Sequence, residues 1–197
     1  MINNSLKWNL NSTKQSSKAT VISFMILRTF NSFSCTPYVS AYKTFVRPHL
    51  EYNCAVWNSC NRNDIQILEK VQRVFTRRLL QKLNIKFSSY EERLNILNIE
   101  KLDSRRLRND LVLVYKMLNN LIDMNFNEFF SMINLTYNLR RHKFTIAKPP
   151  VAKTNILRQY FKHRIVNVWN SLPAAIVEAE SLEIFKYKLK SVRLGSF

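Results

Sequence analysis

Residues 45–80, FVRPHLEYNCAVWNSCNRNDIQILEKVQRVFTRRLL, decide the fold class, because their second half has the spacing of an amphipathic helix. The polar residues at 61–64 offer an N-cap, and Asp64 places an acid in the first turn, where the helix dipole favours negative charge. At about 100° per residue, one face collects the apolar positions 67, 68, 71, 74, 75 and 79. The opposite face collects Lys70, Arg73 and Arg77. The stretch predicts two helices joined by a short polar turn, the second with an outward basic stripe.

The composition also favours helices over sheets. The 197 residues include a single glycine, Gly195, whereas average usage is about 7%. Tight hairpin turns need glycine, so a sheet-rich fold is disfavoured. The formal net charge of +18 indicates a polyanionic partner, nucleic acid before an anionic membrane surface. A solubility charge or a biased base composition is the alternative, and it explains the extra lysines better than the clustered arginines.

Cysteine and histidine suggest no metal or catalytic site. The three cysteines, Cys35, Cys54 and Cys60, lack the spacing of a zinc site. The histidines, His49, His142 and His163, have no evident nucleophile partner and are expected to pack or to lie on the surface. An odd number of cysteines without a secretory signal is typical of an intracellular protein, nuclear or cytoplasmic. The apolar run at 21–27 is too short to span a bilayer, so no membrane association is expected.

The rest of the chain shows further helical periods and one break in the pattern. Helices are predicted at 17–33, from 37 to an interruption at Pro48, at 90–97, at 99–119, as one or two turns within 120–137, at 158–170, and after Ser181. The segment at 138–154, LRRHKFTIAKPPVAKTN, has adjacent prolines and predicts an extended segment with at most a short strand near 144–147. Residues 1–16 are expected to be a partly disordered leader. The predicted fold is mostly α.

Basic residues recur on two of these helices and in the extended segment. We interpret ten of them as candidate contacts to nucleic-acid phosphates: Lys70, Arg73, Arg77, Lys101, Arg105, Arg108, Lys116, Arg140, Arg141 and Lys143. For each residue the alternative is a solvated helix face. The repetition of the stripes, together with the net charge, favours phosphate contact.

Several short sequence motifs, called words below, resemble those of a known protein family. VRPHLEYNCAVWN followed by DIQILEKVQRVFTRRLL resembles the region just past the palm in non-LTR retrotransposon (LINE-like, jockey-type) reverse transcriptases. YEERLNIL, RRLRNDL and YFKHRIVNVWNSLP resemble later words of the same family, and SLKWNL resembles the element after its last palm strand. Arg141 stands where that family usually has glycine. The resemblance extends over residues 5–192, most specifically at 46–80 and 160–173.

The resemblance implies an organisation and a function. Residues 1–16 would end a palm-like region, 17–88 would be a thumb-like helical bundle, and 89–197 a helical connection region. The implied parent activity is RNA-directed DNA synthesis, whose Mg²⁺ ions are held by two or three palm carboxylates. This sequence has no Asp–Asp pair, and its aspartates are scattered: Asp64, Asp103, Asp110 and Asp123. We therefore expect no polymerase activity and no cofactor of this chain alone, and a grip on RNA or an RNA–DNA duplex by its backbone.

Two other functions remain open from the sequence. The helical region could be a protein–protein interaction module that self-associates or binds another protein through an exposed apolar surface. Alternatively, the chain is the product of a decayed element copy and has no selected function.

Overall fold

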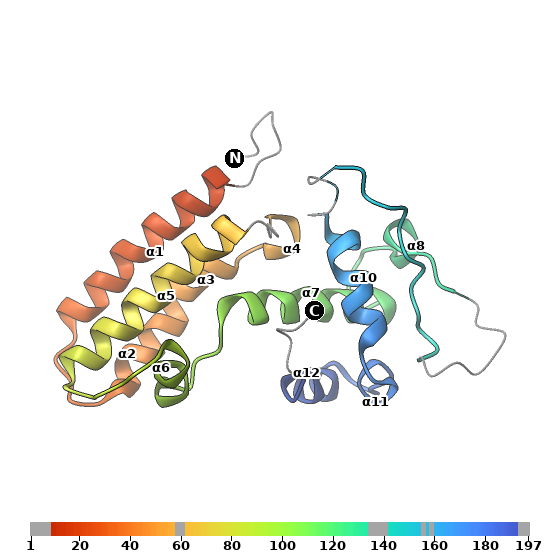
Figure 1. Ribbon diagram of the computed structural model, residues 1–197. Coiled ribbons are helices and arrows are strands. Elements are labelled where there is room, and N and C mark those ends of the chain that lie inside the picture. Colours follow the sequence, from red (N-terminus) through yellow and green to blue (C-terminus); the bar gives the residue numbers. More distant parts are fainter. Residues whose placement is uncertain (1–8, 58–61, 134–141, 155–156, 158–159, 193–197) are drawn as a thin grey trace. The chain divides into compact units, whose positions relative to one another are not determined.

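Helices dominate the described chain (Figure 1). The computed structural model describes residues 9–57, 62–133, 142–154, 157 and 160–192. Within these ranges there is no β-strand, only an isolated antiparallel bridge between Met132 and Ile146. The mostly helical fold predicted from the sequence is confirmed. Among the residues that the structure describes, no helix combines the length and the apolar character needed to cross a bilayer.

The chain divides into two compact units. The first consists of Met1–Asn53 and Ser59–Arg105, and the second of Cys54–Asn58 and Arg106–Phe197. The boundary therefore falls inside one helix, α7 (Leu102–Leu118), whereas the sequence suggested a division between residues 88 and 89. The two differ because the helix predicted at 90–97 packs against the long basic helix and so belongs to the first unit.

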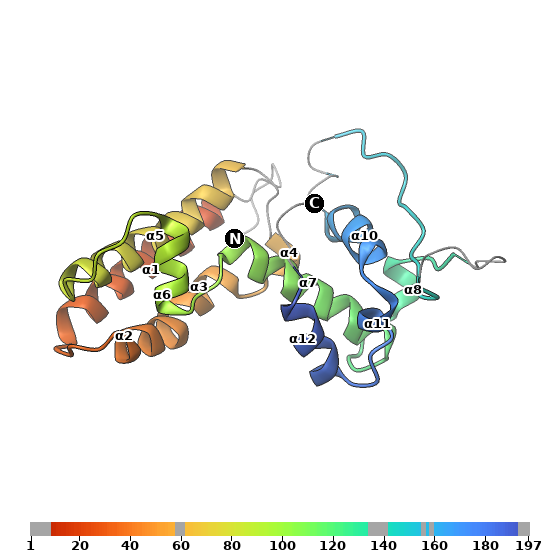
Figure 2. The same cartoon turned by 60° about the horizontal axis from the view of Figure 1, so that its bottom comes forward.

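The first unit is built from helices α1 to α3, α5 and α6. Their bounds are α1 Asn9–Thr29, α2 Cys35–Ala41, the π-helical segment η1 Tyr42–Val46, α3 Arg47–Glu51, α5 Arg62–Lys82 and α6 Tyr90–Leu97. Helices α1 and α5 lie side by side (Figures 1 and 2). The apolar face predicted for α5 is buried at Leu68, Phe75 and Leu79. The Phe75 ring stacks on Tyr42 with 4.6 Å between centroids, which joins α5 to η1.

Helix α1 begins earlier than the sequence suggested. It starts at Asn9, so the expectation of a partly disordered leader is wrong for residues 9–16, while residues 1–8 lie outside the described residues. Ser12 and Ser16 are buried, and the Ser16 hydroxyl donates to the Thr13 carbonyl at 2.9 Å. A serine-rich segment with little apolar character thus lies in a helix that packs against α5, and the buried Ser16 hydroxyl is satisfied by the helix backbone.

The interruption predicted at Pro48 takes the form of one wide helical turn. Proline has no amide hydrogen to donate to the carbonyl four residues earlier, and its ring crowds that carbonyl. The backbone N–H of Arg47 reaches back five residues to the Tyr42 carbonyl, which is the bond of a π-turn. Helix α3 then continues as far as Glu51.

The second unit has its core around Trp169. Its helices are α4 Cys54–Trp57, the later part of α7, α8 Phe126–Phe129, α10 Phe161–Ser171, α11 Ala174–Val177 and α12 Leu182–Lys190. Tyr115 stacks on Phe185 with 4.3 Å between centroids and donates its hydroxyl to the Ala179 carbonyl at 2.6 Å. The predicted N-cap of the last helix is confirmed, since the Ser181 hydroxyl accepts from the Ile184 amide. Helices α4 and α11 were not predicted separately, because four residues show no period.

The extended segment is held by two neighbouring residues of α10. In its described part, residues 142–154, the Trp169 indole donates to the Phe144 carbonyl at 3.0 Å. The side-chain amide of Asn170 accepts from the Ile146 N–H at 2.9 Å and donates to the Ile146 carbonyl at 2.8 Å. The segment is thus bonded to the Asn170 side chain at Ile146, and it also forms the bridge to Met132. The short strand considered near 144–147 is reduced to this bridge.

His142 begins the described part of this segment and should make the second unit sensitive to acid. It is 2% exposed, its Nε2 lies 3.1 Å from the Trp169 carbonyl, and its Nδ1 has no hydrogen-bond partner among the described residues. A carbonyl can only accept, so Nε2 carries the proton and Nδ1 is bare. Burial lowers the pKa of His142, although the backbone hydrogen bond to Trp169 and the Glu178 charge oppose this.

Because the folded-state pKa lies below the unfolded value near 6.5, the unfolded chain takes up the proton first as the pH falls. The neutral His142 therefore leaves the free energy of unfolding at its full value above about pH 6.5. Below that pH the free energy of unfolding decreases, by at most about 1.4 kcal/mol per pH unit for this one group. Urea unfolding followed by tryptophan fluorescence between neutral and mildly acidic pH measures this. The variant His142→Gln keeps a donor for the Trp169 carbonyl and should flatten the slope, whereas an unchanged slope would assign it to other groups.

Candidate nucleic-acid interface

The basic stripe predicted on α5 lies on the surface of the first unit. Lys70, Arg73 and Arg77 are all exposed, at spacings of three and four residues on one helix. The two acidic residues of α5, Asp64 and Glu69, are 3% and 6% exposed. The accessible surface of this helix is therefore cationic, with no exposed carboxylate of its own to neutralise it.

Helix α6 and the residues just before it add aromatic rings and another arginine beside this stripe. The guanidinium carbon of Arg73 lies 4.9 Å from the centroid of the Tyr90 ring. The guanidinium carbon of Arg93 lies 5.2 Å from the same centroid and 5.1 Å from that of Phe87. Ser89 caps α6 by accepting from the Glu92 amide at 3.1 Å. Cation–π contacts of this kind restrain the long arginine side chains.

Arg93 is the buried member of what we call the arginine cluster: Arg73, Arg77 and Arg93. Arg93 is 8% exposed, its Nη1 donates to the Arg73 carbonyl at 3.4 Å, and its Nε has no hydrogen-bond partner among the described residues. Burial lowers the pKa of Arg93, and the charges of Arg77 and Arg73 lower it further, while Tyr90 acts in the opposite direction. Three like charges held close together, one with an unused donor, favour an anionic ligand.

Arg93 is not among the ten basic residues predicted from the sequence to contact phosphates. In YEERLNIL it stands beside two glutamates, and a mixed-charge turn is typical of a solvated helix face. The signal that could have found it is the spacing of Tyr90 and Arg93 on one face of a helix. Its meaning depends on packing of α6 against α5, which a single sequence does not reveal.

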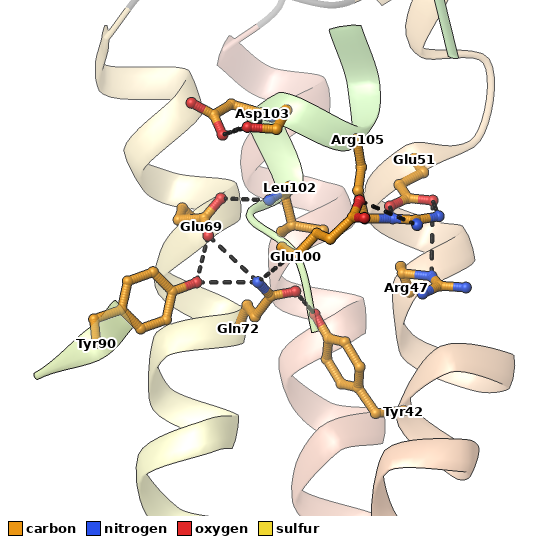
Figure 3. A network of polar contacts seen from close by, with 11 residues as sticks. Tyr42, Arg47, Glu51, Glu69, Gln72, Tyr90, Glu100, Leu102, Asp103 and Arg105 are labelled. Atoms are coloured by element: carbon orange, nitrogen blue, oxygen red, sulfur yellow. Dashed lines mark hydrogen bonds and ion pairs between the residues drawn. The ribbon is translucent and has the colours of Figure 1, made fainter. Parts of the chain in front are cut away.

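A buried carboxylate fixes the Tyr90 ring (Figure 3). Glu69 accepts from the Tyr90 hydroxyl and also from the Leu102 backbone N–H, the latter at 3.0 Å. Burial raises the pKa of Tyr90, and so does the negative charge of Glu69. The hydroxyl therefore stays protonated and acts as a donor to Glu69, and the same carboxylate satisfies an amide in the first turn of α7.

Gln72 completes this buried network from the next turn of α5 (Figure 3). Its Nε2 donates to the Glu100 carbonyl at 2.9 Å and lies 3.0 Å from the Tyr90 hydroxyl. Its Oε1 accepts from the Tyr42 hydroxyl at 2.9 Å. Glu69 and Gln72 thus connect α5 with η1, α6 and the start of α7. Both are buried, and they support the arginine cluster by holding the Tyr90 ring that contacts Arg73 and Arg93.

Lys101 and Arg105, the first two residues of the second predicted stripe, have acidic partners in the first unit. Lys101 lies 3.0 Å from Glu91, and both side chains are largely exposed, so this pair contributes little. Arg105 binds Glu51 through two bonds, from Nε at 2.5 Å and from Nη2 at 3.1 Å, and these raise the pKa of Arg105. Arg47 approaches the same carboxylate at 3.8 Å (Figure 3). A phosphate contact by Arg105 stays a prediction and would compete with Glu51.

The other predicted residues belong to the second unit. Arg108 and Lys116 are half-buried on α7, and Lys143 is exposed with its Nζ 5.0 Å from the Phe144 ring centroid, while Arg140 and Arg141 lie outside the described residues. The stripe expected along the long helix is therefore divided between the two units. The phosphate contacts of these residues stay predictions.

The described residues contain no group of three or more histidine, cysteine, aspartate or glutamate side chains that could hold a metal ion. What the first unit presents is a rigid cationic surface with aromatic support. Such a surface is suited to binding an anion.

Comparisons with known proteins add one distant relative. A segment of 82 residues, 42% of this chain, is 30% identical to an uncharacterized protein of Caenorhabditis elegans, B0403.1. The match spans 41% of that protein, so the chain covers less than half of its relative. No protein-family model matches the sequence, and no solved structure matches it.

Proposed function

We propose that the first unit binds the sugar–phosphate backbone of RNA or of an RNA–DNA hybrid, without reading sequence. The observation that carries this proposal is the arginine cluster of α5 and α6. Guanidinium groups bind phosphate oxygens in a bidentate manner, and here Tyr90 and Phe87 hold two of them in place before any ligand arrives. Contacts to phosphates give affinity without sequence information.

We further propose that the chain corresponds to the thumb and connection regions of a non-LTR retrotransposon reverse transcriptase. The words that resemble that family support this proposal, and so does the mostly helical architecture. In such an enzyme the catalytic carboxylates and their Mg²⁺ ions would belong to the palm. The role of this chain would then be to hold the nucleic acid while another region performs the synthesis.

The variant Arg73→Glu/Arg77→Glu tests the first proposal. Two charge-assisted phosphate contacts, each worth about 1.5–3 kcal/mol, would be lost, so affinity for a labelled RNA–DNA hybrid should fall about a hundredfold or more at low salt. The slope of log affinity against log salt should become shallower by about two, because about two fewer counterions are released. Both positions are exposed, so helicity measured by circular dichroism should not change.

The matched control is Lys14→Glu/Lys18→Glu, which makes the same change in net charge at two exposed positions of α1. Neither lysine belongs to the arginine cluster, so the control should lose far less affinity. Equal losses in the two variants would mean that the hybrid responds only to net charge. Unchanged affinity in Arg73→Glu/Arg77→Glu would refute the proposed interface.

A further inference from the structure

A groove runs between α1 and α5 in the first unit. It contains two cavities of about 600 Å³ each, which share Phe24 of α1 and Arg78 of α5. Arg73 and Arg77 line neither cavity, and Lys70 is the one residue of the predicted α5 stripe that does. The groove is thus a separate feature from the arginine cluster.

The floor of the groove is apolar in its chemistry. Helix α5 contributes Ile67, Val71 and Val74, none of which has a polar side chain. Helix α1 contributes four hydroxyl residues, of which Ser17 is exposed and the other three donate to the helix backbone: Ser16 to Thr13 at 2.9 Å, Thr20 to Ser16 at 2.7 Å and Ser23 to Thr20 at 2.7 Å. A hydroxyl that is bonded in this way offers a ligand little beyond its small size.

The charged residues on the rim of the groove are all cationic. Lys70 and Arg78 lie along α5, and Arg28 and Lys82 border the second cavity. Lys82 is fixed there by donating to the Leu27 and Phe30 carbonyls, both at 2.7 Å. Helix α1 contains no acidic residue, and the two acids of α5 are buried, so no carboxylate of these helices offsets the rim.

We propose that this groove is a docking site for an acidic amphipathic helix of a partner protein. Apolar side chains of the partner would fill the floor beside Phe24, and its flanking carboxylates would meet the cationic rim, as in helix-in-groove recognition. Charge complementarity selects this occupant. A second copy of the chain, with a net charge of +18, would instead be repelled from the rim.

A nucleic-acid strand fits the groove less well than such a helix. Bases bound without sequence preference stack on exposed aromatic faces. The one aromatic residue lining the groove, Phe24, has a ring covered by the Arg78 guanidinium, whose carbon lies 4.3 Å from the centroid. Three of the four hydroxyls that line the groove, those of Ser16, Thr20 and Ser23, already donate to the backbone, which leaves few donors for base edges.

The probe is a fluorescein-labelled peptide of roughly four helical turns, with leucines at spacings of three and four and glutamates elsewhere. Fluorescence anisotropy on the whole chain should give a dissociation constant below about 100 μM, and a peptide of the same composition in scrambled order should bind at least about tenfold more weakly. Equal binding of the two peptides would show attraction of a polyanion only and would overturn the proposal, as would no binding.

Two variants place the binding in the groove. Lys70→Glu/Arg78→Glu reverses the rim, and Ser17→Trp fills the groove from an exposed position without changing the charge. Each should weaken the ordered peptide about tenfold or more, whereas Lys14→Glu/Lys18→Glu, outside the lining, should have a much smaller effect. Similar losses in all three would overturn the proposal. Displacement of the peptide by an RNA–DNA hybrid, with the groove variants losing both ligands equally, would reassign the groove to nucleic acid.

Discussion

Replacing Asp110 with alanine is expected to destabilise the second unit by about 3–5 kcal/mol, because it removes the counter-charge of a buried arginine. Arg164 of α10 donates from Nε to Asp110 of α7 at 3.0 Å, and the two side chains are 6% and 0% exposed. Arg164 also donates from Nη2 to the Ala55 carbonyl at 2.7 Å and approaches that of Cys54 at 3.3 Å. Its charge therefore cannot turn to solvent when the carboxylate is lost.

A double-mutant cycle separates the ion pair from the packing around it. Arg164→Met keeps much of the side-chain volume but removes the charge, and it should also be strongly destabilising. The double variant Asp110→Ala/Arg164→Met should lose clearly less than the sum of the single losses, because no unpaired charge remains from this pair. Additive losses, or an Asp110→Ala variant within about 1 kcal/mol of the parent chain, would show that the pair contributes little.

Tryptophan fluorescence in urea is well suited to this measurement. The chain has three tryptophans, and two of them, Trp57 and Trp169, belong to the second unit and are buried. A Trp8→Phe background removes the third, so the signal follows the second unit. Circular dichroism on the same samples follows the helices of both units, and a difference between the two transitions would show that the units unfold separately.

The sequence motifs that carry the family resemblance contain residues that bond to one another and hold the fold together. The arginine of YFKHRIV binds the aspartate of RRLRNDL, and Glu51 of RPHLEY binds Arg105 of the same word. The glutamate of ILEKVQR accepts from the tyrosine of YEERL. In the closing word VWNSLP, Trp169 and Asn170 hold the extended segment. The partners in each of these contacts are separated by many residues, so the sequence alone does not show that they bond to each other.

Periodicity predicted the long helices because burial of one helix face requires apolar residues at a regular spacing of 3.6 residues. The face of α5 buried at Leu68, Phe75 and Leu79 is the one that the 3.6-residue period indicates. Helix α1 from Asn9 to Ser16 was missed for the opposite reason, since serines that bond to the backbone of their own helix leave no apolar period.

Availability of the basic residues could not be predicted in the same way. Arg73 and Arg77 are exposed as expected, but Arg105 of α7, equally basic in sequence, binds Glu51 of α3. Arg93 is buried beside the other two arginines of the cluster, and the sequence pattern did not predict it as a phosphate contact. A charge pattern along one helix shows which residues share a face, whereas the neighbouring helix determines which of them meet an acid or an aromatic ring.

Replacing Glu69 with alanine is expected to destabilise the first unit by about 3 kcal/mol and, as a consequence, to weaken hybrid binding. The substitution leaves the Tyr90 hydroxyl and the Leu102 amide without their buried acceptor, and each such group costs about 1–3 kcal/mol. Hydrogen exchange measured by mass spectrometry should show faster exchange in α5, α6 and the first turn of α7. Protection equal to that of the parent chain in these helices would show that the network is dispensable.

The Tyr90 variants test whether this network supports the arginine cluster through the ring or through the hydroxyl. Tyr90→Phe removes the bond to Glu69 but keeps the aromatic face 4.9 Å from the Arg73 guanidinium carbon. It should cost stability yet retain most of the affinity for the RNA–DNA hybrid, measured where the variant is folded.

Tyr90→Leu removes the aromatic face as well, and the cation–π contacts of two arginines, each worth about 0.5–2 kcal/mol, are lost with it. Affinity should then fall several-fold, although no residue that would contact phosphate has changed. If Tyr90→Leu bound the hybrid as tightly as Tyr90→Phe, the arginines would need no aromatic support, and the buried network would serve the fold alone.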